Sequence, residues 1–247
     1  MRDIQLILPI IANYIKLKDG KLKQRLDSYS HIISATTYWF ENAKIRNKDS
    51  SYQFNLFDRF KITEPVHSAL VADLLNPSSS HGQGNLFLYS FLHKLGIGTP
   101  EIGTWHITAE KDRIDILLRR NHPHSVVVIE NKSNYADDQK NQMYRYWDRC
   151  IHKPLTKGDA DPDYTKISYA HYRLIYLTPK GIKKMEYHSA LRPDKGCKNV
   201  YEQVPMRIDN HSFDKLVVNW LEDCLIIIKP ENTRLREYIT QYIEYWQ

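Results

Sequence analysis

Two acidic residues and a lysine near the middle of the chain have side chains suited to phosphodiester chemistry. Asp115 lies in the segment RIDILL, and Glu130 and Lys132 lie in the segment VVVIENK. Carboxylate oxygens are the ligands that a hard divalent cation such as Mg²⁺ prefers, and a lysine ammonium is a point charge suited to phosphate. A cation held in this way binds a scissile phosphate and lowers the pKa of a water molecule. The residue types therefore predict metal-assisted hydrolysis of a phosphodiester.

The spacing of these residues predicts that they face one another across a β-hairpin. Both segments are short, aliphatic runs, and the sequence NHPH between them suits a four-residue loop. If Arg120 pairs with Ser125, Asp115 lies directly opposite Glu130, with Cβ atoms about 4.5–5.5 Å apart. Lys132 then shares the face of Glu130, because side chains alternate along a strand. Facing carboxylates repel each other unless a positive charge lies between them, which favours a cation site.

A charged, solvated strand end is the alternative interpretation of the same residues. Glu130 follows four consecutive aliphatic residues, Val126 to Ile129. Such a run predicts a strand that is buried on both faces. Charged residues that emerge from a buried strand are costly unless they are paired or functional, but a glutamate two residues before a lysine is common by chance, and these residues alone leave both interpretations open.

A helix is expected directly after this strand, over residues 137–150. Gln142 and Tyr146 are four residues apart and would share one face of it. The helix would begin beside the carboxylates, with its amide end and these polar groups directed toward nucleic acid. In the alternative interpretation Tyr146 is a core aromatic residue beside Met143 and Trp147, which leaves Gln142 without a role.

Taken together, the segments resemble the PD-(D/E)xK nuclease superfamily. DRIDILL, VVVIENK and QMYRY are similar to its core motifs, with a QxxxY helix as in the RecB-like branch. The upstream stretch EPVHSALVADLLNPSSSHGQGNLFLYSFLHKLGI resembles bacterial members in which a glutamate-containing helix and an LLNP…HGQG loop precede the nuclease core. The resemblance is strongest over residues 64–147. It departs from the motif where Ile114 replaces the proline before the aspartate.

The resemblance implies a fold, a reaction and a cofactor. The fold is a central mixed β-sheet flanked by helices, a restriction-endonuclease-like α/β core, and the reaction is hydrolysis of nucleic acid with Mg²⁺ or Mn²⁺. It makes Asp115, Glu130 and the main-chain carbonyl of Asn131 metal ligands, and Lys132 the catalytic lysine. It also implies that Gln142 and Tyr146 of the QxxxY helix contact the substrate.

The resemblance further places an acid on an upstream helix, and Glu64 matches that position best. His67 competes with it, or contacts substrate, because residues three apart share a helical face, and His81 is a weaker candidate. A carboxylate suits Mg²⁺ better than an imidazole does, which favours Glu64 as a metal ligand. The alternative is that Glu64 only interacts with the helix dipole, which contributes about 0.3–1 kcal/mol.

The remaining sequence predicts one nuclease-like domain with an added helical segment. Residues 1–60 are expected to form helices, interrupted at Asp19-Gly20, that pack on the core, and residues 61–247 the nuclease-like domain. Further strands are expected over residues 171–177 and 200–205, and closing helices over residues 212–225 and 232–246.

Composition narrows the class of partner and compartment. Lys and Arg (35) exceed Asp and Glu (29), giving a net charge of +6, which suits an anionic partner such as nucleic acid. The longest apolar run, Cys224 to Ile228, is far shorter than the roughly 18–20 residues of a membrane helix. Three scattered cysteines favour a reducing cytoplasm.

Together with the resemblance, these observations predict a nuclease, with DNA ahead of RNA as the substrate; the resemblance alone implies phage defence or repair as the role. The alternative is a catalytically idle nuclease-fold protein that binds nucleic acid or a protein partner. The sequence leaves open whether the chain forms an oligomer.

Overall fold

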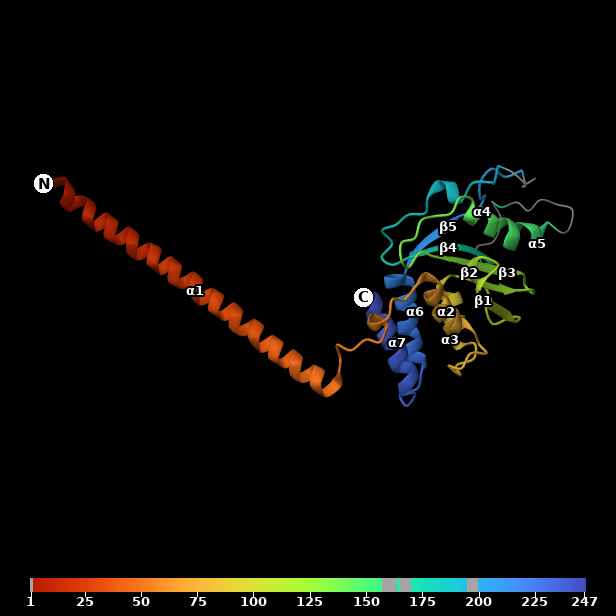
Figure 1. Cartoon of the computed structure of the whole chain (residues 1–247), viewed down its shortest axis with the longest axis horizontal. Helices are drawn as coiled ribbons and strands as arrows, with labels where there is room; N and C mark the ends of the chain where they lie inside the picture. The colour runs from red at the N-terminus through yellow and green to blue at the C-terminus, as the bar shows by residue number, and fades with distance from the viewer. Residues whose placement is uncertain (1, 157–163, 165–169, 195–199) are drawn as a thin grey trace. The chain divides into compact units, whose positions relative to one another are not determined.

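A computed structural model describes residues 2–156, 164, 170–194 and 200–247 of the chain (Figure 1). Contacts divide the chain into two units, Met1–Asn55 and Leu56–Gln247. No helix in the described ranges is both long enough and apolar enough to cross a membrane.

The first unit consists mainly of one helix, α1 (Arg2–Ser50). The expected interruption at Asp19-Gly20 is wrong, because the helix continues through both residues. A glycine inside a helix costs only about 1 kcal/mol relative to alanine, and good helix formers flank it in the sequence IKLKDGKLKQRL. Large apolar side chains of α1, including Leu26 and Trp39, are exposed within this unit. Packing of residues 1–60 on the core stays a prediction.

The second unit is built on a five-stranded mixed sheet with the strand order β1-β2-β3-β4-β5. Neighbours are antiparallel from β1 to β3 and parallel from β3 to β5, which confirms the predicted mixed sheet. The predicted strand over residues 200–205 is wrong: within it Gln203 forms an isolated bridge with Leu191. The strands are β1 (Trp105–Lys111), β2 (Ile114–Arg120), β3 (Ser125–Asn131), β4 (Tyr172–Thr178) and β5 (Ile208–Ser212).

Helices cover both faces of this sheet (Figure 1). One face carries α2 (Glu64–Leu75), α3 (Leu86–Lys94), α6 (Val218–Ile227) and α7 (Thr233–Trp246), and the other carries α4 (Gln142–Trp147) and α5 (Lys153–Leu155). All seven residues of β3 are buried, as its aliphatic run predicts. Val127 and Ile129 enter the core on the first side, whereas Val126 and Val128 enter the core on the second. The strand that carries Glu130 near its end is therefore held from both sides.

The helix predicted over residues 137–150 begins five residues later, at Gln142. Asn141 has φ of 62°, in the left-handed region, so the helix cannot extend backward through it. The preceding loop is fixed by the buried Asp138, whose Oδ1 accepts a hydrogen bond from the Tyr176 hydroxyl at 2.7 Å. Its Oδ2 accepts one from the Glu186 main-chain N–H, also at 2.7 Å. The acid thus binds tertiary partners rather than the start of the helix.

Candidate active site

The β2–β3 hairpin brings the two predicted carboxylates together. Its register pairs Arg120 with Ser125 and Ile116 with Ile129, which confirms the predicted pairing. Continuing that register by one residue places Asp115 opposite Glu130 at the open end of the hairpin. Asp115 Oδ2 accepts a hydrogen bond from the main-chain N–H beyond Glu130, that of Asn131, at 2.6 Å. The aspartate is therefore anchored to the neighbouring strand.

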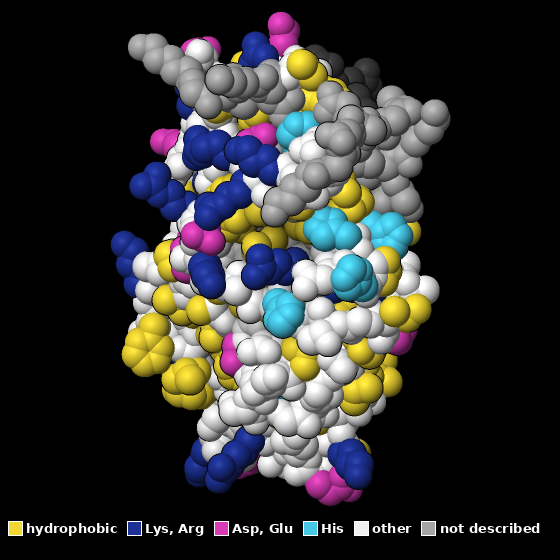
Figure 2. All heavy atoms as spheres, turned by 90° about the vertical axis from the view of Figure 1, so that its right-hand side faces the viewer, with side chains coloured by type: hydrophobic (Ala, Val, Ile, Leu, Met, Phe, Trp, Pro, Cys, Tyr) yellow, Lys and Arg dark blue, Asp and Glu magenta, His cyan; other side chains and the backbone are white. Residues whose placement is uncertain are grey.

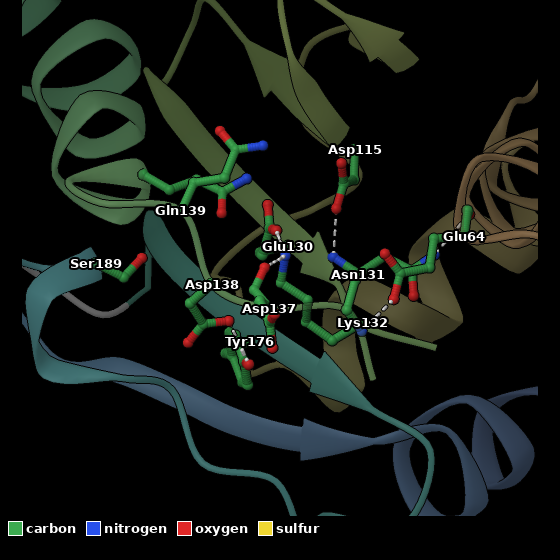
Figure 3. Close-up of polar contacts among 12 residues, drawn as sticks. Glu64, Asp115, Glu130, Asn131, Lys132, Asp137, Asp138, Gln139, Tyr176 and Ser189 are labelled. Atoms are coloured by element: carbon green, nitrogen blue, oxygen red, sulfur yellow. Dashed lines mark hydrogen bonds and ion pairs between the residues drawn. The ribbon is translucent and has the colours of Figure 1, made fainter. Parts of the chain in front are cut away.

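A buried ion pair joins Glu130 to Lys132 (Figure 3). Lys132 Nζ lies 2.7 Å from Glu130 Oε1, and the two side chains are only 5% and 1% exposed. Lys132 Nζ also donates to the Asp137 carbonyl at 3.3 Å. The second glutamate oxygen, Oε2, has no hydrogen-bond partner within the described part of the chain. The glutamate thus presents one paired and one unpaired oxygen inside the protein.

Burial makes both carboxylates hard to ionise, and at Asp115 the charge of the neighbouring glutamate adds to this effect. Burial, followed by the negative charge of Glu130, raises the pKa of Asp115 from 3.8 to about 8. Burial also raises the pKa of Glu130, against the opposing effect of the Lys132 ammonium. A second positive charge between the carboxylates would remove this cost, because an adjacent cation favours the ionised form.

Asn131 ties this strand end to helix α2. Its side-chain Nδ2 donates to the Glu64 carbonyl at 2.8 Å and to Ser68 Oγ at 3.0 Å. Its Oδ1 accepts the Ser133 N–H at 2.9 Å, and the residue is 1% exposed. The resemblance in sequence implied a role only for the main-chain carbonyl of Asn131. A polar residue at the end of a buried aliphatic strand was the signal that its side chain also forms structural hydrogen bonds.

Glu64 lies at the start of α2, beside the loop that follows β3 (Figure 3). Its half-buried carboxylate accepts hydrogen bonds at Oε1 from the N–H groups of Asn134 (3.0 Å) and Ala136 (3.3 Å). Burial lowers the pKa of Lys132, but the negative charges of Glu130 and Glu64 outweigh it and the net pKa is raised. Glu64 therefore contributes to the field at the lysine and organises the loop around it.

The structure places His67 in the core and away from this loop. Its ring is fully buried and packs against Phe213, Tyr245 and Trp246, and its Nδ1 lies 2.9 Å from the Tyr242 hydroxyl. Burial lowers its pKa to about 4. Glu64 and His67 lie on the same helix, but Glu64 contacts the loop after β3 and His67 contacts the core. The structure therefore brings Glu64, and not His67, toward the carboxylates.

Glu64→Gln separates a charge effect from a structural one. The amide oxygen of Gln can still accept from Asn134 and Ala136, whereas the negative charge is lost. We expect the free energy of unfolding to change by less than about 0.5 kcal/mol and the cleavage rate to fall by at least about tenfold, with partial recovery at higher Mn²⁺. Cleavage kinetics across a Mn²⁺ titration, together with urea unfolding, measure both effects.

His67→Ala is the matching variant in the core. Removing a buried aromatic ring should cost about 2–4 kcal/mol of stability and leave turnover unchanged at temperatures where the variant is folded. Full activity of Glu64→Gln combined with an inactive, folded His67→Ala would reverse the assignment.

Gln142 and Tyr146, the two residues of the QxxxY pattern, are buried and bonded to each other. Gln142 Nε2 donates to the Tyr146 hydroxyl at 2.9 Å, and that hydroxyl donates to the Arg113 carbonyl at 2.6 Å. Burial, followed by the negative charges of Glu130 and Asp115, raises the pKa of Tyr146. The pair therefore holds the backbone two residues before Asp115. Direct contact of Gln142 and Tyr146 with substrate stays a prediction.

His81 organises the loop between α2 and α3. Its Nδ1 accepts the Gln83 N–H at 3.0 Å, and its Nε2 lies 3.0 Å from the Asn76 carbonyl. Nε2 is therefore the protonated nitrogen. The ring also stacks on Phe87. These contacts give His81 a structural role in the loop.

The donor set fits a hard cation that keeps much of its water. Among the described residues, no three His, Cys, Asp or Glu side chains gather as a ready-made metal cage. Two carboxylates, one with an unpartnered oxygen at Glu130, suit Mg²⁺ or Mn²⁺, which binds through one or two carboxylates and several waters. Asp115 and Glu130 would hold such an ion, with the main-chain carbonyl of Asn131 at the same strand end.

Comparison with known families agrees with the fold. The family model of the PD-(D/E)XK nuclease superfamily matches residues 54–244, well over half of the chain. The chain therefore belongs to the PD-(D/E)XK nuclease superfamily, which indicates a nuclease whose substrate is nucleic acid. No curated protein and no solved structure was found to match it.

Proposed function

We propose that the chain is a metal-dependent phosphodiester hydrolase that cleaves nucleic acid with Mg²⁺ or Mn²⁺. The observation that supports this most is the cluster of the half-buried Asp115 with the buried Glu130 and Lys132, in which burial raises the pKa of both carboxylates and one oxygen of Glu130 has no partner. Structural ion pairs rarely leave a buried oxygen without a partner. A site that receives a divalent cation accounts for both features.

In this proposal each residue has a distinct task. Asp115 and Glu130 hold the cation, which when bound would stabilise charge on the phosphate and make a water more acidic. Lys132 keeps its proton, because Glu130 and Glu64 raise its pKa, and its ammonium orients the attacking water and the phosphate. The Asp137 carbonyl fixes the ammonium within the site. Burial of the cluster excludes bulk water, which strengthens each of these electrostatic interactions.

We place DNA ahead of RNA as the substrate, and phage defence or repair as the role, on the resemblance of the motifs. Labelled single-stranded DNA, double-stranded DNA and RNA, each incubated with Mg²⁺, Mn²⁺ or EDTA, test the activity and the substrate together. We expect metal-dependent cleavage of at least one DNA substrate. Cleavage of RNA alone would overturn the choice of substrate, and no cleavage of any polymer would overturn the activity.

A catalytically idle nuclease fold is the second candidate. The absence of a group of three or more His, Cys, Asp or Glu side chains in the described ranges favours it, as does the Lys132 ion pair that already neutralises Glu130. Calorimetric titration with Mg²⁺ and Mn²⁺ separates the two candidates. Binding at millimolar concentrations supports the enzyme, and no binding supports the idle fold.

A further inference from the structure

A groove opens beside the candidate active site, between the β1–β2 turn and the helical segment from α4 to α5. Its first hollow, about 580 Å³, is lined by Tyr146 and by the basic residues Arg113, Arg145, Arg149 and Lys153. An adjoining hollow of about 400 Å³ shares Asp112 and Arg149 with the first and continues to Arg119 and the hairpin loop. The two hollows therefore form one track along β2, on the side of the sheet where α4 and α5 lie.

The track has an excess of positive charge. Its acids, Asp112 and Asp148, are engaged by Arg149 at 2.9 Å and by Lys153 at 2.7 Å. Of the other basic residues, Arg120 is buried, whereas Arg113, Arg119 and Arg145 are exposed; these three supply the accessible charge. None of the three forms one of the salt bridges found within the described ranges. Figure 2 shows Lys and Arg side chains gathered on the face that lies at the right of Figure 1, near several histidines.

The track is joined to the active site by a shared backbone. Asp112 and Arg113 have φ values of 59° and 64°, an uncommon conformation for residues other than glycine. The Tyr146 hydroxyl fixes the Arg113 carbonyl at 2.6 Å, and Arg149 Nη1 fixes the Asp112 carbonyl at 3.0 Å. The turn that leads into Asp115 is thus held in place by the same helical segment that supplies the cations.

We propose that this cationic track, defined by Arg113, Arg119, Arg145, Arg149 and Lys153, binds backbone phosphates of the nucleic-acid strand next to the scissile bond. The inference rests on the proposed nuclease function and specifies how the substrate is held. Cations spread over two adjoining hollows suit a repeating anion better than a single small one. Two aromatic rings line the hollows as described: Tyr146 is buried, and the half-buried His124 is engaged by the Tyr172 hydroxyl at 2.9 Å. Contacts therefore fall on phosphates, which gives binding without sequence preference.

The salt dependence of binding tests this proposal without cleavage. Affinity for a labelled single-stranded DNA, long enough to span both hollows, is measured in EDTA across a NaCl series. For single strands, log affinity falls linearly as log salt rises, and each lost phosphate contact lowers the magnitude of this slope by about 0.7. The double variant Arg119→Gln/Arg145→Gln should therefore lower the slope by about 1.4 and weaken binding by at least about tenfold at low salt.

The matched control is Lys229→Gln/Arg234→Gln, which removes the same charge from exposed residues outside the track. Its slope should equal that of the unmodified chain. An unchanged slope in the track variant, or an equal drop in the control, overturns the proposal. Arg145 also bonds to the Lys140 carbonyl at 2.6 Å, so Lys153→Gln serves as a second variant that removes no main-chain contact, with an expected drop of about 0.7.

The same proteins separate failure of the track from failure of the activity. Cleavage by the unmodified chain in Mg²⁺ or Mn²⁺ with an unchanged slope in the track variants overturns the track alone. A lowered slope with no cleavage under any condition supports the track as a nucleic-acid surface and overturns the nuclease.

Discussion

Lys132→Ala should abolish cleavage, lowering the rate by about 10²–10⁴-fold, while the chain stays folded. The ammonium lies 2.7 Å from Glu130 Oε1 and contacts the Asp137 carbonyl, so its loss removes the positive charge that the proposed mechanism places beside the phosphate. Glu130 then becomes more readily protonated, because its ion-pair partner is gone, and this limits the cost in stability. Single-turnover cleavage assays and circular dichroism measure the rate and the fold.

The control for this prediction is Lys184→Ala, which removes an exposed lysine outside the site and should leave the rate within about twofold. Lys132→Arg keeps the charge but cannot reproduce the compact ammonium, so it should retain only a small part of the rate. A Lys132→Ala variant that cuts at the unmodified rate would remove this lysine from the active site.

Asp115→Asn should stabilise the metal-free chain above neutral pH and eliminate tight metal binding. The folded-state pKa of Asp115 is raised to about 8 from 3.8, so the folded state holds its proton more tightly than the unfolded state does. The stability of the unmodified chain should therefore fall as pH rises from about 4 to about 8. Asn can still accept the Asn131 N–H and is never ionised. We expect it to gain about 1–3 kcal/mol at pH 8 and nothing at pH 4.

Urea unfolding at several pH values, with and without Mg²⁺, measures this effect. Mg²⁺ should stabilise the unmodified chain by mass action and leave Asp115→Asn unaffected. Asp209→Asn is a control for which the opposite change in stability is expected. Asp209 lies 2.6 Å from Arg207 Nε, and the loss of a paired carboxylate lowers stability. If Asp115→Asn were less stable than the unmodified chain at pH 8, the pKa of Asp115 would not be raised by burial and by the charge of Glu130.

The hairpin was predictable because all of its determinants are local. The loop NHPH fixes where the strands turn, and period-two alternation then assigns each face, so the register at Ile116 and Ile129 followed from the sequence. The aliphatic run of β3 likewise predicted burial on both faces. Elements of this kind need no knowledge of distant segments.

Contacts between distant segments decided the features that were missed. His67 and Tyr242 are 175 residues apart in sequence, and helical spacing alone cannot tell whether His67 faces a core or a metal. Asp138 resembles a helix-start residue, yet Tyr176 and Glu186 hold it in a loop. The strand β5 has the polar sequence IDNHS, which lacks the aliphatic signal of its neighbours.

Asn131 also has a consequence for the rigidity of the site. It joins β2, β3 and α2 through the hydrogen bonds at Asp115, Glu64 and Ser68, all of which are made between protein groups. The site is therefore preorganised, and cation binding need not be offset by the entropy of ordering a loop. Local unfolding of α2 would break the hydrogen bonds that link Glu64 and Ser68 to Asn131 in one step. The amide protons of α2 and those at the end of β3 should then exchange with solvent as one cooperative unit.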